Sequence, residues 1–221
     1  MPEQHVMYMW PQDLKVLVRI VAIVRACQDS GISPAPLTTI HAVAYFADVL
    51  APVWQIPVLE SQILKKAELP TNPELQRDID RLVGIGVLVP SNIRHIQSGA
   101  LWRLDANYAL HSLFGPRILD ALERDNQYSR ELHFVREVTL ALAGIGTYGL
   151  GGAVLADATY SDPLLGIGSV VDLAPENSRI TRTVEVSERF RTLMASQRKL
   201  SDAEVIHLYV RHLYSALKAG G

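Results

Sequence analysis

The sequence predicts a mainly α-helical protein with a small β-wing, in which a winged helix-turn-helix is followed by a helical region. Residues 72–104 read as a short amphipathic helix, a glycine-containing exit and two short apolar strands around a polar turn, which is how a winged helix-turn-helix ends. Apolar residues at helical spacing dominate most of the remaining chain. We therefore expect a winged-helix-like domain over residues 1–110 and an α-helical region packed against it over residues 111–221.

The first helix is expected at residues 12–29, because Asp13 stands at its start and Gly31 follows its end. Its side chains are apolar almost all round, which is typical of a helix at the centre of a core or of an interface. Cys27, the only cysteine, lies in this helix and indicates a buried thiol in a reducing compartment. We expect a cytoplasmic protein.

The same helix is not expected to span a membrane. Lys15, Arg19 and Arg25 interrupt the apolar run at residues 14–27, which is also too short for a bilayer. The start of the chain lacks the small-residue cleavage pattern of a secretory signal. We therefore expect no membrane partner.

Two further helices are expected before the wing. One begins at Thr38 or Thr39 and ends at Pro52. A shorter one, at about residues 58–67, is bracketed by Pro57 and Pro70.

The third helix of the module has its own start and stop signals. Asn72 is suited to capping it, and Pro73 occupies its first turn, where a missing N–H costs nothing. Gly84 and Gly86 permit a left-handed exit. The wing is then expected as a strand at 87–89, a polar turn at 91–99 and a returning strand at 100–104.

After the wing the chain is expected to be helical again. Ser201 and Glu204 form the pattern of a capping box at the start of the last helix. The expected helices are 116–124, 128–143, 181–195 and 201–218, with a glycine-rich stretch at 144–152 and an irregular segment at 153–178 that holds a short strand at 170–171.

The candidate nucleic-acid contacts follow from the winged-helix interpretation. Gln76, Arg77 and Arg81 lie on the solvent face of the third helix, and Arg94 and His95 lie on the wing. Carboxylates on the same helix would be repelled by the like-charged DNA backbone. The alternatives to DNA binding are therefore that the helix surface binds protein or has only a structural role. These carboxylates are Glu74, Asp78 and Asp80.

The end of the chain offers a second candidate surface. The formal net charge of the chain is only −2, but eight Lys and Arg residues face five acids from Glu176 onward. The last helix carries a broad apolar stripe that either closes the core or docks on a partner. The candidate partner-binding residues are Arg189, Arg191, Arg198, Lys199, Arg211, Tyr209 and Tyr214.

No catalytic constellation stands out, and we expect no catalytic residues, no metal and no cofactor. Residues 144–149 match the letters of the dinucleotide-binding fingerprint, but the pattern before them has helical spacing, whereas the mechanism needs a strand there. The alternative is a turn between two packed helices. Asp157, Asp162 and Asp172 could hold a hard cation, although caps and Asx-turns explain such loop aspartates equally.

Four stretches together resemble the accessory "middle component" of prokaryotic ABC three-component systems, found beside ABC/SMC-like ATPases in anti-phage defence. The resemblance implies a non-enzymatic, winged-helix adaptor that joins an ATPase to an effector and has no catalytic residues. The stretches are residues 40–47, 75–90, 157–163 and 206–211.

We therefore expect a non-catalytic adaptor that binds protein subunits through its first and last helices, with DNA open as a second partner. The alternatives are a winged-helix DNA-binding transcriptional regulator and an enzyme that uses the Gly144–Gly149 loop. The oligomeric state and the identity of the partner stay open.

Overall fold

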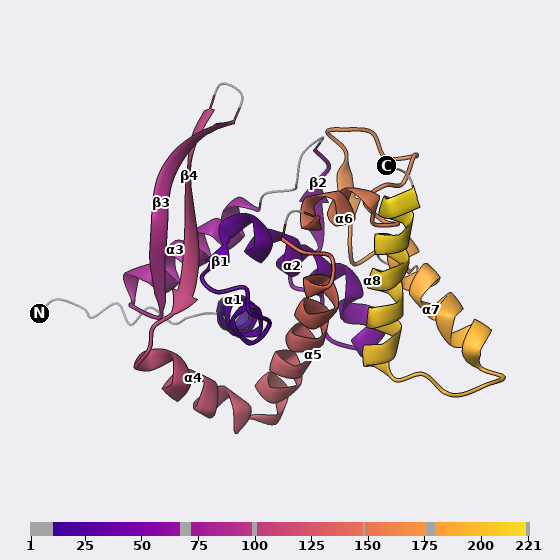
Figure 1. The fold of residues 1–221 in the computed structure, drawn as a ribbon, viewed down its shortest axis with the longest axis horizontal. Coiled ribbons are helices and arrows are strands. Elements are labelled where there is room, and N and C mark those ends of the chain that lie inside the picture. Colours follow the sequence, from indigo (N-terminus) through magenta and orange to yellow (C-terminus); the bar gives the residue numbers. More distant parts are fainter. Residues whose placement is uncertain (1–10, 67–71, 99–100, 148, 176–179, 220–221) are drawn as a thin grey trace, which may run out of the picture.

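The computed structural model describes residues 11–66, 72–98, 101–147, 149–175 and 180–219 and shows a mainly helical fold with small antiparallel sheets (Figure 1). In chain order its elements are α1 (Pro11–Asp29), β1 (Ala35–Pro36), α2 (Leu37–Leu50), the 3-10 helix η1 (Ala51–Trp54), β2 (Gln62–Leu64), α3 (Pro73–Gly84), β3 (Leu88–Ser98), β4 (Leu101–Leu110), α4 (Phe114–Glu123), α5 (Asn126–Ala143), α6 (Leu150–Ala156), β5 (Val170–Asp172), α7 (Arg182–Met194) and α8 (Asp202–Ala219).

Helix α1 lies in the middle of the molecule, with the β3–β4 hairpin on one side and α7 and α8 on the other (Figure 1). It packs against α5, α2 and α3, and α5 in turn packs against α8. Ile20, Ile23, Phe46 and Phe134 are among the fully buried side chains. The helices after the hairpin therefore share one hydrophobic core with those before it. The boundary predicted at residue 110 coincides with the end of β4 and stays a prediction.

The strands form two antiparallel sheets. The larger has the order β1-β4-β3, so that β4 pairs with both β3 and the short β1. The smaller joins distant parts of the chain, because β2 pairs with β5 through Ile63 opposite Val171. Gly168 N and Lys65 N extend this contact with hydrogen bonds to the Lys65 and Ser169 carbonyls, at 2.9 and 2.8 Å.

The apolar side of α1 is covered by the chain itself. The residues from Leu17 to Cys27 are buried, apart from exposed Arg25. Burial raises the pKa of the Cys27 thiol to about 12, so the predicted buried thiol is confirmed. Residues Leu37–Trp54 are long and apolar enough to cross a membrane, but 83% of this stretch is buried inside the chain, which is typical of the core helix of a soluble protein.

Several predicted helices and caps are confirmed. The Asn72 side chain accepts hydrogen bonds from Glu74 N and Leu75 N, at 2.8 and 3.3 Å, at the start of α3. At the start of α8, Ser201 N donates to the Glu204 carboxylate at 2.8 Å, and Glu204 N donates to the Ser201 hydroxyl at 3.3 Å. Because these signals act within a few residues, the sequence shows them directly.

The helix predicted at residues 58–67 is wrong. The described part of this segment contains β2, and η1 extends α2 before it. The pairing of β2 with β5 is a long-range contact, and tertiary contacts of this kind override local propensity.

The predicted wing is too short. Strand β3 continues to Ser98, through most of the segment predicted as a polar turn, and Ser98 pairs with Leu101 of β4; residues 99–100 lie outside the described residues. Arg94 and His95 therefore lie within β3 and not in a turn. A β-bulge interrupts the register between Ser91 and Arg94, with Asn92 at a φ of 49°. Of the two predicted exit glycines, Gly84 ends α3 and only Gly86 has a positive φ, 76°.

Candidate functional site

Helix α3 presents a polar face whose charges largely neutralise one another. Leu75, Ile79 and Leu82 are buried and fix the orientation of the helix. On the solvent side, Gln76 Nε2 donates to Asp80 Oδ1 at 2.8 Å, and Arg77 forms an ion pair with Glu74.

Arg81 is the α3 arginine for which no ion pair is seen within the described residues. Of the candidate DNA contacts on α3, Gln76 and Arg77 are thus already engaged with carboxylates of the same helix.

The hairpin brings an ion pair and exposed apolar side chains together. Arg94 Nη2 lies 3.0 Å from Asp105 Oδ2, opposite it in the sheet, and exposed His95 stands opposite Leu104. Ile93, in the bulge, is 57% exposed, and Leu104 is 46% exposed. Bulges often turn a side chain away from the sheet. A wing that binds phosphates relies on free basic side chains. The described part of this hairpin instead exposes apolar side chains, and its Arg94 is paired with Asp105.

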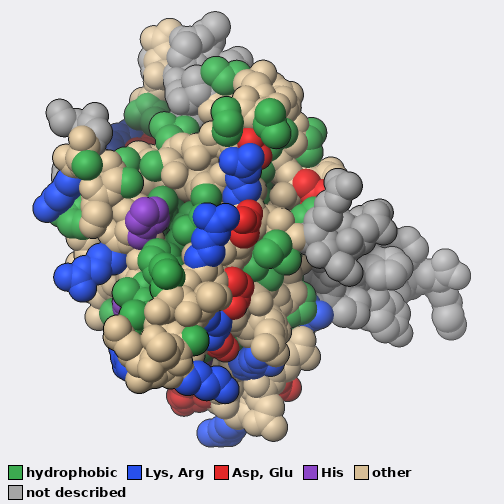
Figure 2. Space-filling model, turned by 90° about the vertical axis from the view of Figure 1, so that its right-hand side faces the viewer, with side chains coloured by type: hydrophobic (Ala, Val, Ile, Leu, Met, Phe, Trp, Pro, Cys, Tyr) green, Lys and Arg blue, Asp and Glu red, His purple; other side chains and the backbone are tan. Residues whose placement is uncertain are grey.

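The predicted basic patch on α7 and α8 is an intermixed surface. Figure 2 shows basic and acidic side chains alternating along the middle of the face that carries these helices. The ion pairs are Arg189 with Glu185 at 2.6 Å, Arg191 with Glu188 at 3.0 Å and with Asp202 at 2.7 Å, and Arg198 with Glu204 at 2.6 Å.

Of the remaining candidates on α8 and on the segment before it, three stay at the surface and one does not. Lys199 and Arg211 are exposed, and half-buried Tyr214 has Lys218 Nζ 4.4 Å from its ring centroid. Tyr209 is fully buried in the core, so its proposed contact with a partner is wrong. Its position on the inner face of α8 explains this, since the apolar stripe of that helix closes the core.

The Gly144–Gly149 segment lacks the setting of a dinucleotide site. The element before it is helix α5, where the fingerprint needs a strand, and α6 after it is a short helix. The segment is therefore the connection between two packed helices, as the alternative interpretation predicted.

The three loop aspartates do not converge. Asp162 Oδ1 accepts from Leu164 N at 2.9 Å and Asp172 Oδ1 from Ala174 N at 2.9 Å, which are local turn contacts. Over the described ranges no group of three or more His, Cys, Asp or Glu side chains could hold a metal ion.

Asp157 is the acceptor at the centre of a buried hydrogen-bond network. It follows α6 and is fully buried. The Tyr45 and Tyr209 hydroxyls each donate to its carboxylate at 2.5 Å, and the Thr183 hydroxyl donates at 2.7 Å. Thr159 N and Tyr160 N donate at 3.0 and 3.1 Å. The network joins α2, α7 and α8 inside the core.

Arg19 is the centre of a second buried network. Its guanidinium contacts Asp48 Oδ1 at 2.5 Å and Glu131 Oε1 at 2.5 Å, which ties α1 to α2 and α5. Leu59 N and Glu60 N also donate to Asp48, at 2.9 and 3.3 Å. Burial raises the pKa of Asp48 to about 6, although Arg19 and the two amides oppose the rise.

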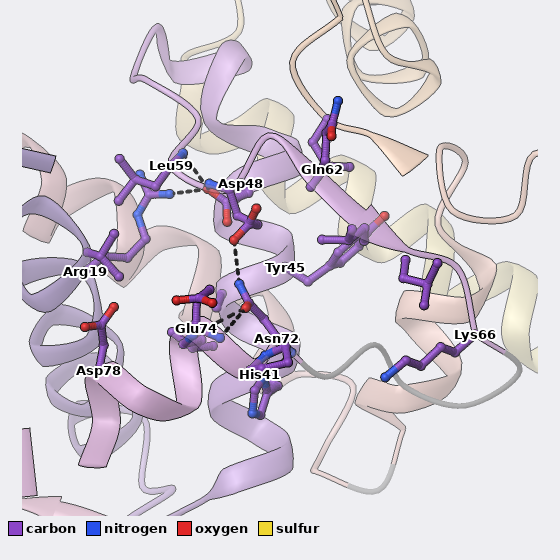
Figure 3. A pocket seen from close by; sticks show the side chains of 18 residues that line it. Arg19, His41, Tyr45, Asp48, Leu59, Gln62, Lys66, Asn72, Glu74 and Asp78 are labelled. Carbon is purple, nitrogen blue, oxygen red and sulfur yellow. Dashed lines mark hydrogen bonds and ion pairs between the residues drawn. The ribbon is translucent and has the colours of Figure 1, made fainter. Parts of the chain in front are cut away.

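A cavity of about 430 Å³ lies beside this network, between α1, α2, β2 and the first half of α3 (Figure 3). Arg19 and Lys66 enter it from opposite sides, and Asp48, Asn72 and Glu74 lie between them. The Asn72 side-chain amide donates to Glu60 Oε2 at 2.7 Å. Tyr45 and Leu75 contribute to its walls.

The sequence alone does not reveal this cavity, because its lining residues come from five separated segments. Its local signal is Arg19, one of three basic residues in the apolar run of the first helix, and the sequence alone presents these residues only as an obstacle to membrane insertion. Glu60 and Gln62 lie in the segment that was wrongly expected to be helical.

Comparison of the chain with protein-family models, with curated proteins and with solved structures found no match.

Proposed function

We propose that this chain is a non-catalytic adaptor subunit of a larger prokaryotic assembly. The ATPase-linked anti-phage complexes suggested by the sequence resemblance are the first candidates.

We also propose that α1 to β4 are a winged helix-turn-helix. Two observations support that fold: α3 directly precedes the long hairpin, and the sheet has the order β1-β4-β3.

The observation that carries the adaptor proposal is the neutralised face of α3. Glu74 engages Arg77 and Asp80 engages Gln76, so two side chains that a DNA-reading helix would offer are occupied. Freeing them on DNA would leave carboxylates beside phosphates, which is unfavourable. A protein partner imposes no such penalty, because it can supply cations of its own.

The exposed apolar side chains of the hairpin also support binding to a protein partner. Ile93 and Leu104 expose 57 and 46% of their surface, and Val89, on the opposite face of the sheet from Leu104, exposes 42%. Beyond β4, at the start of α4, Leu113 and Phe114 expose 68 and 47%. Exposed apolar side chains that gather along one element are typical of protein-binding surfaces. We therefore place the main partner contact on the hairpin, whereas sequence analysis placed it on the first and last helices.

Co-expression with the product of a neighbouring ATPase gene tests the proposal. We expect the two chains to co-purify, and the Ile93→Ser/Leu104→Ser variant to bind about tenfold more weakly or worse, since apolar anchors dominate such interfaces. Calorimetric titration of the purified chains gives the Kd. Leu193→Ser is the control, because Leu193 is 72% exposed on α7, away from the hairpin. A monomeric chain that binds no neighbouring gene product would contradict the proposal.

DNA binding by a transcriptional regulator is the second candidate, and the order of α3 and the hairpin favours it. It predicts a mobility shift of duplex DNA at low salt that weakens steeply as salt rises. Arg81→Ala is expected to weaken binding by about 1–3 kcal/mol if Arg81 reaches a base edge. Arg25→Ala, an exposed arginine on α1, is the control. The absence of a shift at low salt would exclude this candidate.

A further inference from the structure

We propose that the cavity between α1, α2, β2 and α3 binds an organic cation, an ammonium or guanidinium group carried on an apolar stem. The proposal is independent of the adaptor function. Such a group occurs in free small-molecule amines and at the end of lysine and arginine side chains, and the two sources share the same chemistry.

The size of the cavity suits one small group. Its volume of about 430 Å³ lies within the range of small-molecule sites, roughly 300–1,000 Å³. The floor rests on rigid structure, because Ala44 and Tyr45 lie on buried α2 and Leu75 is anchored in the core by α3. A ligand would therefore meet a largely preformed surface.

The charge of the lining favours a cation. Four carboxylates and two permanent cations line the cavity, a formal charge of −2 with His41 neutral. Arg19 is committed to Asp48 and Glu131 in the buried network, and Glu74 forms an ion pair with Arg77, so the attraction for a cation depends mainly on Glu60. The carboxylates are Asp48, Glu60, Glu74 and Asp78, and the cations are Arg19 and Lys66.

Glu60 is the carboxylate best placed to bind the cation. It is half-buried, and the Asn72 amide donates to it at 2.7 Å, which holds it in place without cancelling its charge. No ion pair of Glu60 is seen within the described ranges. A partly desolvated carboxylate attracts a cation more strongly than one in water does.

The rest of the lining determines what carries the positive charge. Aliphatic side chains and the Tyr45 ring form much of the wall and suit an apolar stem. A bare metal ion fits poorly, because the described residues offer no cluster of three metal-ligating side chains. An anion would face the net negative charge. The apolar residues are Val16, Ala44, Leu59, Ile63, Leu64, Leu75 and Leu173.

Titration of the full chain with benzylamine, followed by amide NMR, tests the proposal. Benzyl alcohol has nearly the same shape without the charge, and benzoate reverses the charge. We expect benzylamine to shift the amide signals of Ala44, Gln62 and Leu75 saturably, with an affinity that falls as salt rises. The other two compounds are expected to bind at least about fivefold more weakly.

The variants Glu60→Gln and Asp78→Asn locate the binding charge. Each is expected to raise the Kd of benzylamine about fivefold to tenfold. Glu60→Gln keeps an oxygen that accepts from Asn72, and an unchanged remaining spectrum shows that each variant is folded. Glu185→Gln removes the same charge from α7, outside the cavity, and is expected to leave the Kd unchanged.

A blocked Leu-Arg-Leu peptide and its citrulline counterpart separate the two sources. Tighter binding of the arginine peptide than of benzylamine identifies a protein side chain as the ligand, and the reverse order identifies a free amine. Equal binding of benzylamine and benzyl alcohol would overturn the proposal, as would full affinity in both folded cavity variants.

Discussion

Replacing Asp157 with leucine is expected to lower the free energy of unfolding by about 4 kcal/mol or more. Three buried hydroxyls, those of Tyr45, Tyr209 and Thr183, would lose their acceptor. Each buried donor left without a partner costs about 1–3 kcal/mol. Because the three belong to α2, α8 and α7, the loss is expected to loosen the packing of these helices together. Urea denaturation followed by circular dichroism measures the change.

The milder substitution Asp157→Asn separates the loss of charge from the loss of the network. Asparagine keeps the volume and one acceptor oxygen, and the tyrosine hydroxyls are able to rotate and accept from its amide, so we expect a smaller loss of about 1–3 kcal/mol. Asp172→Asn is the control, since exposed Asp172 accepts from Ala174 N in a local turn, where asparagine serves equally. Wild-type stability of Asp157→Leu would show that the network does not hold the helices together.

The features that sequence analysis predicted correctly depend on local interactions. The start of α3 follows from Asn72 and the start of α8 from Ser201 and Glu204, because a cap and the amides that it satisfies lie within a few residues. The apolar periodicity of α5 and α8 likewise marks the faces that are buried. Such signals do not depend on where the rest of the chain lies.

The features that it missed depend on contacts between distant residues. β2 forms a strand because β5, far along the chain, pairs with it. Asp157 was considered only as a loop aspartate, whereas the structure places it against Tyr45 and Tyr209, 112 and 52 positions away. The candidate cavity was invisible for the same reason, since α1, α2, β2 and α3 each contribute only part of its lining.

Replacing Arg19 with methionine is expected to lower the free energy of unfolding by about 3–5 kcal/mol. Methionine retains much of the apolar packing of the arginine stem, but it leaves buried Asp48 and half-buried Glu131 without their shared cation. Removing one partner of a buried ion pair destabilises a protein more than replacing both partners with apolar residues does, because the remaining charge is buried without hydration or a counter-charge. Urea denaturation at several pH values measures both the loss and its pH dependence.

The pH dependence identifies Asp48 as the source of the loss. The pKa of Asp48 is about 6 in the folded chain against an ordinary value of 3.8, so the folded state binds more protons between these values and stability falls as pH rises through them. Without Arg19 the pKa rises further. The loss of unfolding free energy in Arg19→Met is therefore expected to be largest at neutral pH and to shrink as the pH is lowered toward 3.8.

Arg25→Met is the control, because it breaks the exposed pair with Asp29 on the same helix. It is expected to lower the free energy of unfolding by less than about 1 kcal/mol at any pH. A pH-independent deficit in Arg19→Met would show instead that lost packing dominates at this position.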